Sequence, residues 1–144
     1  MKRLRLNYPQ NGKTWWWHVL VFDSKVRMWD WYRNWCRTTG KKGEKYGGFL
    51  AQHCAYTLHR IKSDGSEEMS GEIGMLMFHQ GCLGSVIVSH EAVHAALQYM
   101  RVTAGIPRLD PQNCDEEEER LAYHISDLTQ ALVKKFYQHG FYQK

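Results

Sequence analysis

Apolar segments separated by polar turns predict strands and one helix in the first third of the chain. Residues 15–22 are rich in aromatic and branched side chains and end at Asp23 and Ser24, which predicts a buried strand followed by a helix N-cap. Apolar side chains recur at helical spacing over residues 24–38, and Gly40 then predicts the helix end. The expected stripes are Val26, Trp29, Tyr32 and Cys36, with Met28, Trp31 and Trp35 as a second one.

A polar, glycine-rich loop at residues 40–48 precedes a second group of strands. The loop lacks the Gly-Lys-Ser/Thr ending of a phosphate-binding loop. Residues 49–60 alternate apolar and polar side chains, residues 62–66 have the composition of a turn, and residues 73–79 are apolar. This pattern predicts two strands paired as a hairpin.

Two amphipathic segments in the second half predict helices. In the first, residues 85–101, the expected buried stripe is Val86, Val93, Leu97 and Met100. A loop marked by Gly105, Pro107 and Pro111 follows. The last helix is expected to begin at Asp115 with carboxylates in its first turn, where they favour the helix dipole. Its apolar positions are Leu121, Ile125, Leu128 and Leu132.

Together these elements predict one α+β domain over residues 1–144. A small antiparallel or mixed sheet is expected to pack on the helix of residues 85–101 and on the C-terminal helix. The length of 144 residues is sufficient to bury a core without disulfides. Residues 1–48 form a basic, aromatic-rich extension, and residues 49–144 supply the sheet and the two later helices.

Composition indicates a globular protein with an uneven charge distribution. Hydrophobic residues make up 43% of the chain and charged residues 24%, which excludes a disordered protein. The net charge is +4, but residues 1–60 carry twelve Lys and Arg against three Asp and Glu, whereas residues 61–144 carry seven against twelve. The basic part could attract nucleic acid or an acidic protein surface. Core packing and protein binding are the favoured roles for its tryptophans.

Cysteine spacing and hydropathy indicate which cellular compartment to expect. The chain contains no Cys-x-x-Cys pair, so the sequence indicates neither a zinc ribbon nor a redox site. The apolar stretch of residues 15–22 is far shorter than a membrane span, and the first residues lack a signal-peptide cleavage site. We therefore expect a cytoplasmic protein with free thiols and no membrane association. The oligomeric state stays open. The cysteines are Cys36, Cys54, Cys82 and Cys114.

A His-Glu-x-x-His motif lies within the helix predicted for residues 85–101. Side chains four positions apart share one helix face, so His90 and His94 can bind one Zn²⁺ ion at about 2.0–2.1 Å. Glu91 is offset from that face. Its carboxylate is therefore expected beside the ion, as a general base for metal-bound water.

A catalytic zinc usually has three protein ligands and one open position. Leu97 and Met100 occupy the places where a metzincin needs Gly and His, which excludes that class. Among the carboxylates that begin the last helix, Glu119 is the preferred third ligand. Glu118 is the alternative, because it is in phase with the apolar seam of that helix. The remaining possibilities are Asp110, His124 and a site without a third protein ligand.

These residues make the chain resemble a zincin metallopeptidase of the gluzincin type, in which a His-Glu-x-x-His helix is joined by a Glu from a downstream helix. In that family the last helix has the pattern Glu-x-x-small-Asp, and Glu119, Ala122 and Tyr123 stand in the corresponding places. Tyr123 departs from the Asp that would hold the first histidine, and Asp127 is the alternative. Over about residues 72–132 the chain also resembles small phage and mobile-element proteins with a minimal metal core.

The resemblance implies hydrolysis of a peptide bond in a protein or peptide substrate, with Glu91 as base and then as acid. It also implies that residues 71–80 form the edge strand that pairs with the substrate. The reaction needs a donor for the developing negative charge on oxygen. The candidates are Tyr123, Tyr99 and His79. The alternative is a zinc-binding interaction or inhibitor module that binds a host protein without cleaving it; nucleic-acid binding is less favoured.

Other histidines have simpler interpretations. His53 and His59 share one side of a predicted strand and could form a second metal site. Side chains that alternate toward solvent are the preferred explanation. His18 and His139 have no partner at ligand spacing.

Overall fold

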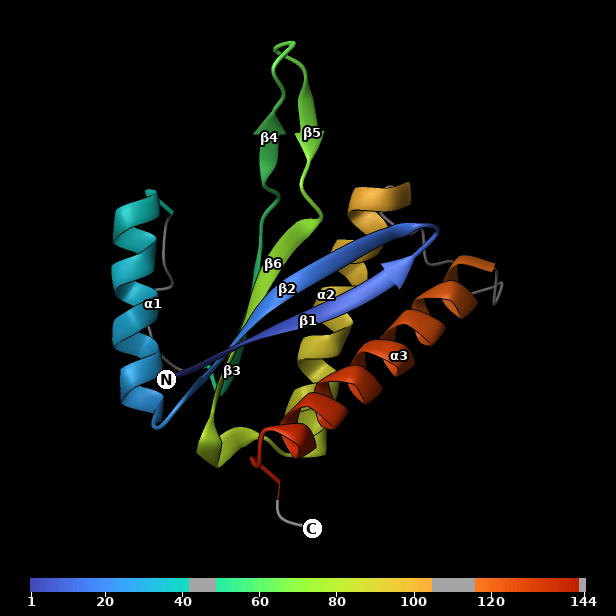
Figure 1. Cartoon of the computed structure of the whole chain (residues 1–144). Coiled ribbons are helices and arrows are strands. Elements are labelled where there is room, and N and C mark those ends of the chain that lie inside the picture. The colour runs from blue at the N-terminus through green and yellow to red at the C-terminus, as the bar shows by residue number, and fades with distance from the viewer. Residues whose placement is uncertain (42–48, 105–115, 143–144) are drawn as a thin grey trace.

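A four-stranded mixed sheet forms the centre of the molecule in the computed structural model, which describes residues 1–41, 49–104 and 116–142 (Figure 1). Its strand order is β1-β2-β6-β3. The β1–β2 and β3–β6 pairs are antiparallel, and the β2–β6 pair is parallel. The expected α+β class with a small mixed sheet is confirmed. The strands are β1 (Lys2–Gln10), β2 (Lys13–Phe22), β3 (Ala51–Ala55) and β6 (Glu72–His79).

β1 is an addition to the expected elements. Leu4, Leu6 and Tyr8 are buried and alternate with exposed polar residues, as in a strand with one covered face. Asn11 and Gly12 connect β1 to β2 with φ angles of 49° and 76°. Two consecutive residues in the left-handed region form the tight turn that matches the twist of a hairpin.

Helices cover both faces of the sheet (Figure 1). α1 (Lys25–Thr39) packs on one face through Met28, Tyr32 and Cys36, whereas Val26 is exposed. The Ser24 side chain accepts a hydrogen bond from the Arg27 backbone N–H, and Gly40 ends the helix with a φ of 68°. Both predicted ends of this helix are therefore confirmed.

α2 (Ser85–Ala104) and α3 (Glu116–Gln138) cover the other face and pack against each other (Figure 1). A short 3₁₀ turn, η1 (Gln80–Cys82), leads from β6 into α2. The predicted stripe of α2 is confirmed at Met100 only, because Val86 is 81% exposed and Val93 and Leu97 are partly exposed. The buried positions are the polar Glu91 and Gln98 together with Val88, Ala92, Ala95, Ala96, Tyr99 and Met100. Small side chains face the sheet and α3 because α2 is packed between them.

The strand at residues 71–80 is central, which corrects its expected position at the edge. β6 lies between β2 and β3, and all its residues are buried. The edge next to α2 is β3. The expected pairing of residues 49–60 with residues 73–79 is confirmed for β3, which is antiparallel to β6. The strand is interrupted after β3, and β4 (His59–Ile61) pairs with β5 (Glu67–Met69) in a hairpin that projects from the sheet (Figure 1).

Some sequence-based expectations lie outside the described residues: most of the glycine-rich loop, the loop of residues 105–115, and the helix start at Asp115. Cys36, Cys54 and Cys82 are free thiols. Across residues 1–41, 49–104 and 116–142, no helix has both the length and the apolar character that a bilayer crossing needs.

Gly71 fixes the start of β6 against β2, and we expect Gly71→Ala to destabilise the fold. Gly71 has a φ of 89°, and an added Cβ would lie 2.6 Å from the Thr14 carbonyl oxygen. Its own carbonyl accepts the Trp16 N–H at 2.8 Å. The left-handed backbone alone should lower the free energy of unfolding by about 1–2 kcal/mol, and the clash adds to this. Urea denaturation measures the change.

Gly65→Ala is the matched control for this prediction. Gly65 has a similar φ of 81° in the β4–β5 turn, but nothing lies within 4 Å of an added Cβ. Equal losses in the two variants would show that the contact with Thr14 contributes nothing.

Candidate metal centre

His90 and His94 meet on the exposed side of α2. Their Nε2 atoms are 3.2 Å apart, and their ring centroids are 4.9 Å apart. Two nitrogens bound to one zinc in a tetrahedral site are separated by about 3.3 Å, given Zn–N bonds of about 2.0–2.1 Å. The observed spacing therefore suits two ligands of one ion, as it also suits one proton shared between the rings.

Glu91 is buried beside this pair. Its side chain is 3% exposed, and Oε2 has no hydrogen-bond partner among the described residues. Burial raises the pKa of Glu91 to about 7. A carboxyl group in this setting can exchange a proton near neutral pH, which is the property expected of a general base.

A cavity of about 190 Å³ separates the histidine pair from β3. Its lining comes from α2 and from the segment around β3: Phe49, Ala51, Gln52, His53, His90, Glu91 and His94. The motif therefore faces the free edge strand of the sheet.

His53 lies in this cavity, so its expected exposure to solvent was wrong. Its ring is parallel to that of His94, with centroids 6.2 Å apart, and its Nε2 atom is buried. Burial, and then the charges of His94 and Arg101, lower the pKa of His53 to about 3. His59 fits the expectation, since its side chain is 44% exposed and lies near Glu67. The break between β3 and β4 separates the two histidines.

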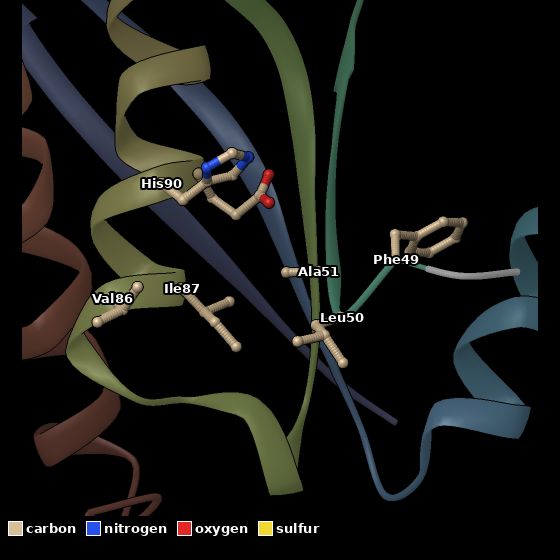
Figure 2. Close-up of a pocket in the computed structure, with 7 residues that line it drawn as sticks. Phe49, Leu50, Ala51, Val86, Ile87 and His90 are labelled. Carbon is tan, nitrogen blue, oxygen red and sulfur yellow. The ribbon is translucent and has the colours of Figure 1, made fainter.

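A second cavity, of about 310 Å³, adjoins the first and is mainly apolar (Figure 2). His90 and Ala51 border both cavities, and the side chains of Val86, Ile87 and Leu50 extend the surface along α2 and the start of β3. An apolar side chain bound here would therefore lie next to His90.

The structure does not bring Glu119 or Glu118 to the histidine pair. α3 runs antiparallel to α2, and His124 of α3 contacts Tyr99 of α2 with ring centroids 4.7 Å apart (Figure 1). Glu119 lies five residues before His124 on α3, and His94 lies five residues before Tyr99 on α2. Because the helices are antiparallel, these two positions lie on opposite sides of the contact along the helix axes. At 1.5 Å per residue, they are about 15 Å apart along the helices. The packing of α3 on another face of α2 thus separates the expected third ligand from the pair.

The remaining residues expected from α3 also lie elsewhere. Tyr123 is 67% exposed. The Tyr8 hydroxyl lies 2.7 Å from His124 Nδ1 and donates to Asp127 at 3.5 Å, so these two side chains belong to a separate cluster with β1. Asp110 is outside the described residues.

The other two expected oxyanion donors are also remote from the pair. Tyr99 is buried against Tyr8 and Trp15. His79 ends β6 and does not line either cavity at the motif.

No group of three His, Cys, Asp or Glu side chains in the described part of the chain has the arrangement of a metal site. The motif supplies two ligand side chains and a buried carboxylate, with His53 as the next nearest histidine. Spacing along the sequence did not indicate His53, because its position depends on how β3 packs against α2. The available signal was strand alternation: His53 follows Ala51 by two residues and therefore lies on the same face of β3.

No family model matches the chain, and comparisons with curated proteins and with solved structures found no match.

Proposed function

We propose that the chain is a zinc-dependent, metallopeptidase-like hydrolase in which His90 and His94 hold one Zn²⁺ ion. The observation that carries the proposal is the 3.2 Å separation of the two Nε2 atoms, on the rim of a cavity that also contains the buried Glu91. When bound, zinc would polarise a substrate carbonyl and make water more acidic.

The chain itself contributes proton transfer through Glu91. Because Oε2 has no partner among the described residues, it is available to accept a proton from the attacking water. The same carboxyl group can then return that proton to the leaving nitrogen. The protein surroundings of Glu91 exclude bulk water and so strengthen these interactions.

A peptide is the substrate class that the surroundings support best. β3 ends the sheet, so the described residues leave one of its edges unpaired, and an extended peptide could add there as a further strand. An apolar side chain of that peptide would fit the 310 Å³ cavity (Figure 2). The described lining of both cavities contains no Lys or Arg, which disfavours a phosphate-bearing substrate.

A zinc-binding interaction module is the second candidate. Tyr123, Tyr99 and His79 all lie away from the pair, so the chain's expected donors for a negatively charged oxygen are not at the site. Without such a donor the transition state of peptide hydrolysis is poorly stabilised. A protein that binds a partner through this site without cleaving it is therefore the alternative.

Metal content tests the part that both candidates share. After dialysis against buffer without added metal, we expect about one zinc per wild-type chain by elemental analysis and much less in His90→Ala, because one imidazole alone binds zinc weakly. His59→Ala is the matched control, since His59 lies on the projecting hairpin, and it should keep its zinc. A wild-type chain that takes up no zinc when supplied with it would overturn both candidates.

A further inference from the structure

His53 faces α2 from the edge of the sheet. In the antiparallel register of β3 with β6, His53 pairs with Leu76 and Ala51 pairs with Phe78. Alternate residues of a strand share a face, so His53 points to the same side as the buried Ala51. That side is the one covered by α2, and the cavity there is shared by His53, His90 and His94.

The ring of His53 occupies its position without polar compensation. Nε2 is buried and has no hydrogen-bond partner among the described residues. A buried nitrogen without a partner costs free energy and is an exception that calls for an explanation. A metal-binding role for the ring offers such an explanation, because His53 shares its cavity with His90 and His94.

Gly74 provides the space in which the ring is held. A Cβ atom at position 74 would lie 3.0 Å from His53 Nε2 and 2.9 Å from Trp17 Cδ1. The ring thus extends over β6 where a side chain would block it, and it also lines the cavity that it shares with His94.

His53 is the next nearest histidine to the pair. The centroids of His90 and His94 are 4.9 Å apart, and those of His53 and His94 are 6.2 Å apart. Because Nε2 lies against β6, His53 must rotate about its side-chain bonds to bring a ring nitrogen to the pair. Glu119, by contrast, is about 15 Å from His94 along the helices.

We propose that His53 is the third protein ligand of the zinc site, supplied by the edge strand of the sheet. This inference rests on the proposed function, because it requires that His90 and His94 bind zinc. Three neutral imidazoles leave the ion with its full double charge, whereas a glutamate ligand would neutralise part of it. They also leave a fourth position open.

Zinc affinity, measured by competition with a chromophoric chelator, tests the assignment. Outer partners of a metal ligand typically contribute about 10–100-fold to affinity, so removal of a direct ligand in His53→Ala should cost at least about 100-fold. Glu119→Gln and His59→Ala should stay within about threefold of the wild type, since neither residue lies at the cavity. The metal-free variants are compared by circular dichroism, and His53→Gln replaces His53→Ala if the alanine variant does not fold.

Substitution of Co²⁺ for zinc gives a second readout that does not depend on activity. The visible bands of Co²⁺ report the number and type of its ligands, so His53→Ala should change their position and intensity, whereas His59→Ala should not. Full affinity and an unchanged spectrum in His53→Ala would overturn the inference and leave the proposed function standing, as would a loss of zinc in Glu119→Gln instead. A wild-type chain without zinc would overturn the proposed function itself.

Discussion

Replacing Glu91 with glutamine is expected to abolish peptide hydrolysis while zinc stays bound. Glutamine has almost the same shape, but its amide cannot accept the proton of the attacking water. General-base catalysis typically contributes about 10²–10⁴-fold, so the rate should fall by that factor. Zinc content should not change, because the ligands proposed for the ion are His90, His94 and His53.

The measurement is cleavage of a quenched fluorescent peptide library that includes apolar residues on both sides of the cleaved bond. Glu68→Gln is the matched control. It removes a carboxylate from the exposed β4–β5 hairpin and should cleave like the wild type. If the wild type and Glu91→Gln bind zinc equally and neither cleaves any peptide, the interaction module replaces the hydrolase as the preferred function.

Replacing Phe136 with alanine is expected to cause a large loss of stability. Phe136 is fully buried on α3, and its ring contacts Phe78 of β6 with centroids 5.3 Å apart. It also contacts Phe141 and Tyr142 after the helix. Removing such a ring leaves a cavity that neighbouring side chains fill incompletely, so the free energy of unfolding should fall by about 3–5 kcal/mol.

Urea denaturation in the presence of a chelator measures this loss without a contribution from metal. Tyr123→Ala is the control on the same helix, since Tyr123 is largely exposed, and its effect should stay within about 0.5 kcal/mol. A loss at Tyr123 comparable to that at Phe136 would contradict the packing of α3 described above.

Local signals explain the parts of the fold that the sequence predicted well. Ser24 and Gly40 act on the backbone within a few residues, so both ends of α1 were readable. The Asn11-Gly12 turn is equally local, and with the alternation of Leu4, Leu6 and Tyr8 it would have predicted the β1–β2 hairpin.

The order of the strands could not be predicted from local signals. An apolar segment such as residues 73–79 indicates burial on both sides, but it does not specify its neighbours. The place of β6 between β2 and β3 arises from pairings with distant segments. The same limit applies to α2, where apolar periodicity favoured Val86 and the packing buried Ala92 and Ala95.

In the candidate site, too, local features could be predicted from the sequence and long-range packing could not. The spacing of His90 and His94 is a property of one helix, so their shared face followed from the sequence. The third ligand depends on which element packs beside that face. The sequence favoured Glu119 of α3, whereas the structure places β3 and His53 there.

The parallel pairing of β2 with β6 also has a consequence for how fast the molecule can fold. Trp16 pairs with Glu72, so this contact closes a loop of more than fifty residues, while the β1–β2 hairpin needs a two-residue turn. Closing a long loop is entropically costly, and folds dominated by such contacts form slowly. β3 attaches to the sheet through β6, and α2 follows β6 in the chain. The two walls of the cavity at His90 and His94 therefore both belong to the part of the chain that joins the β1–β2 hairpin through this long-range pairing.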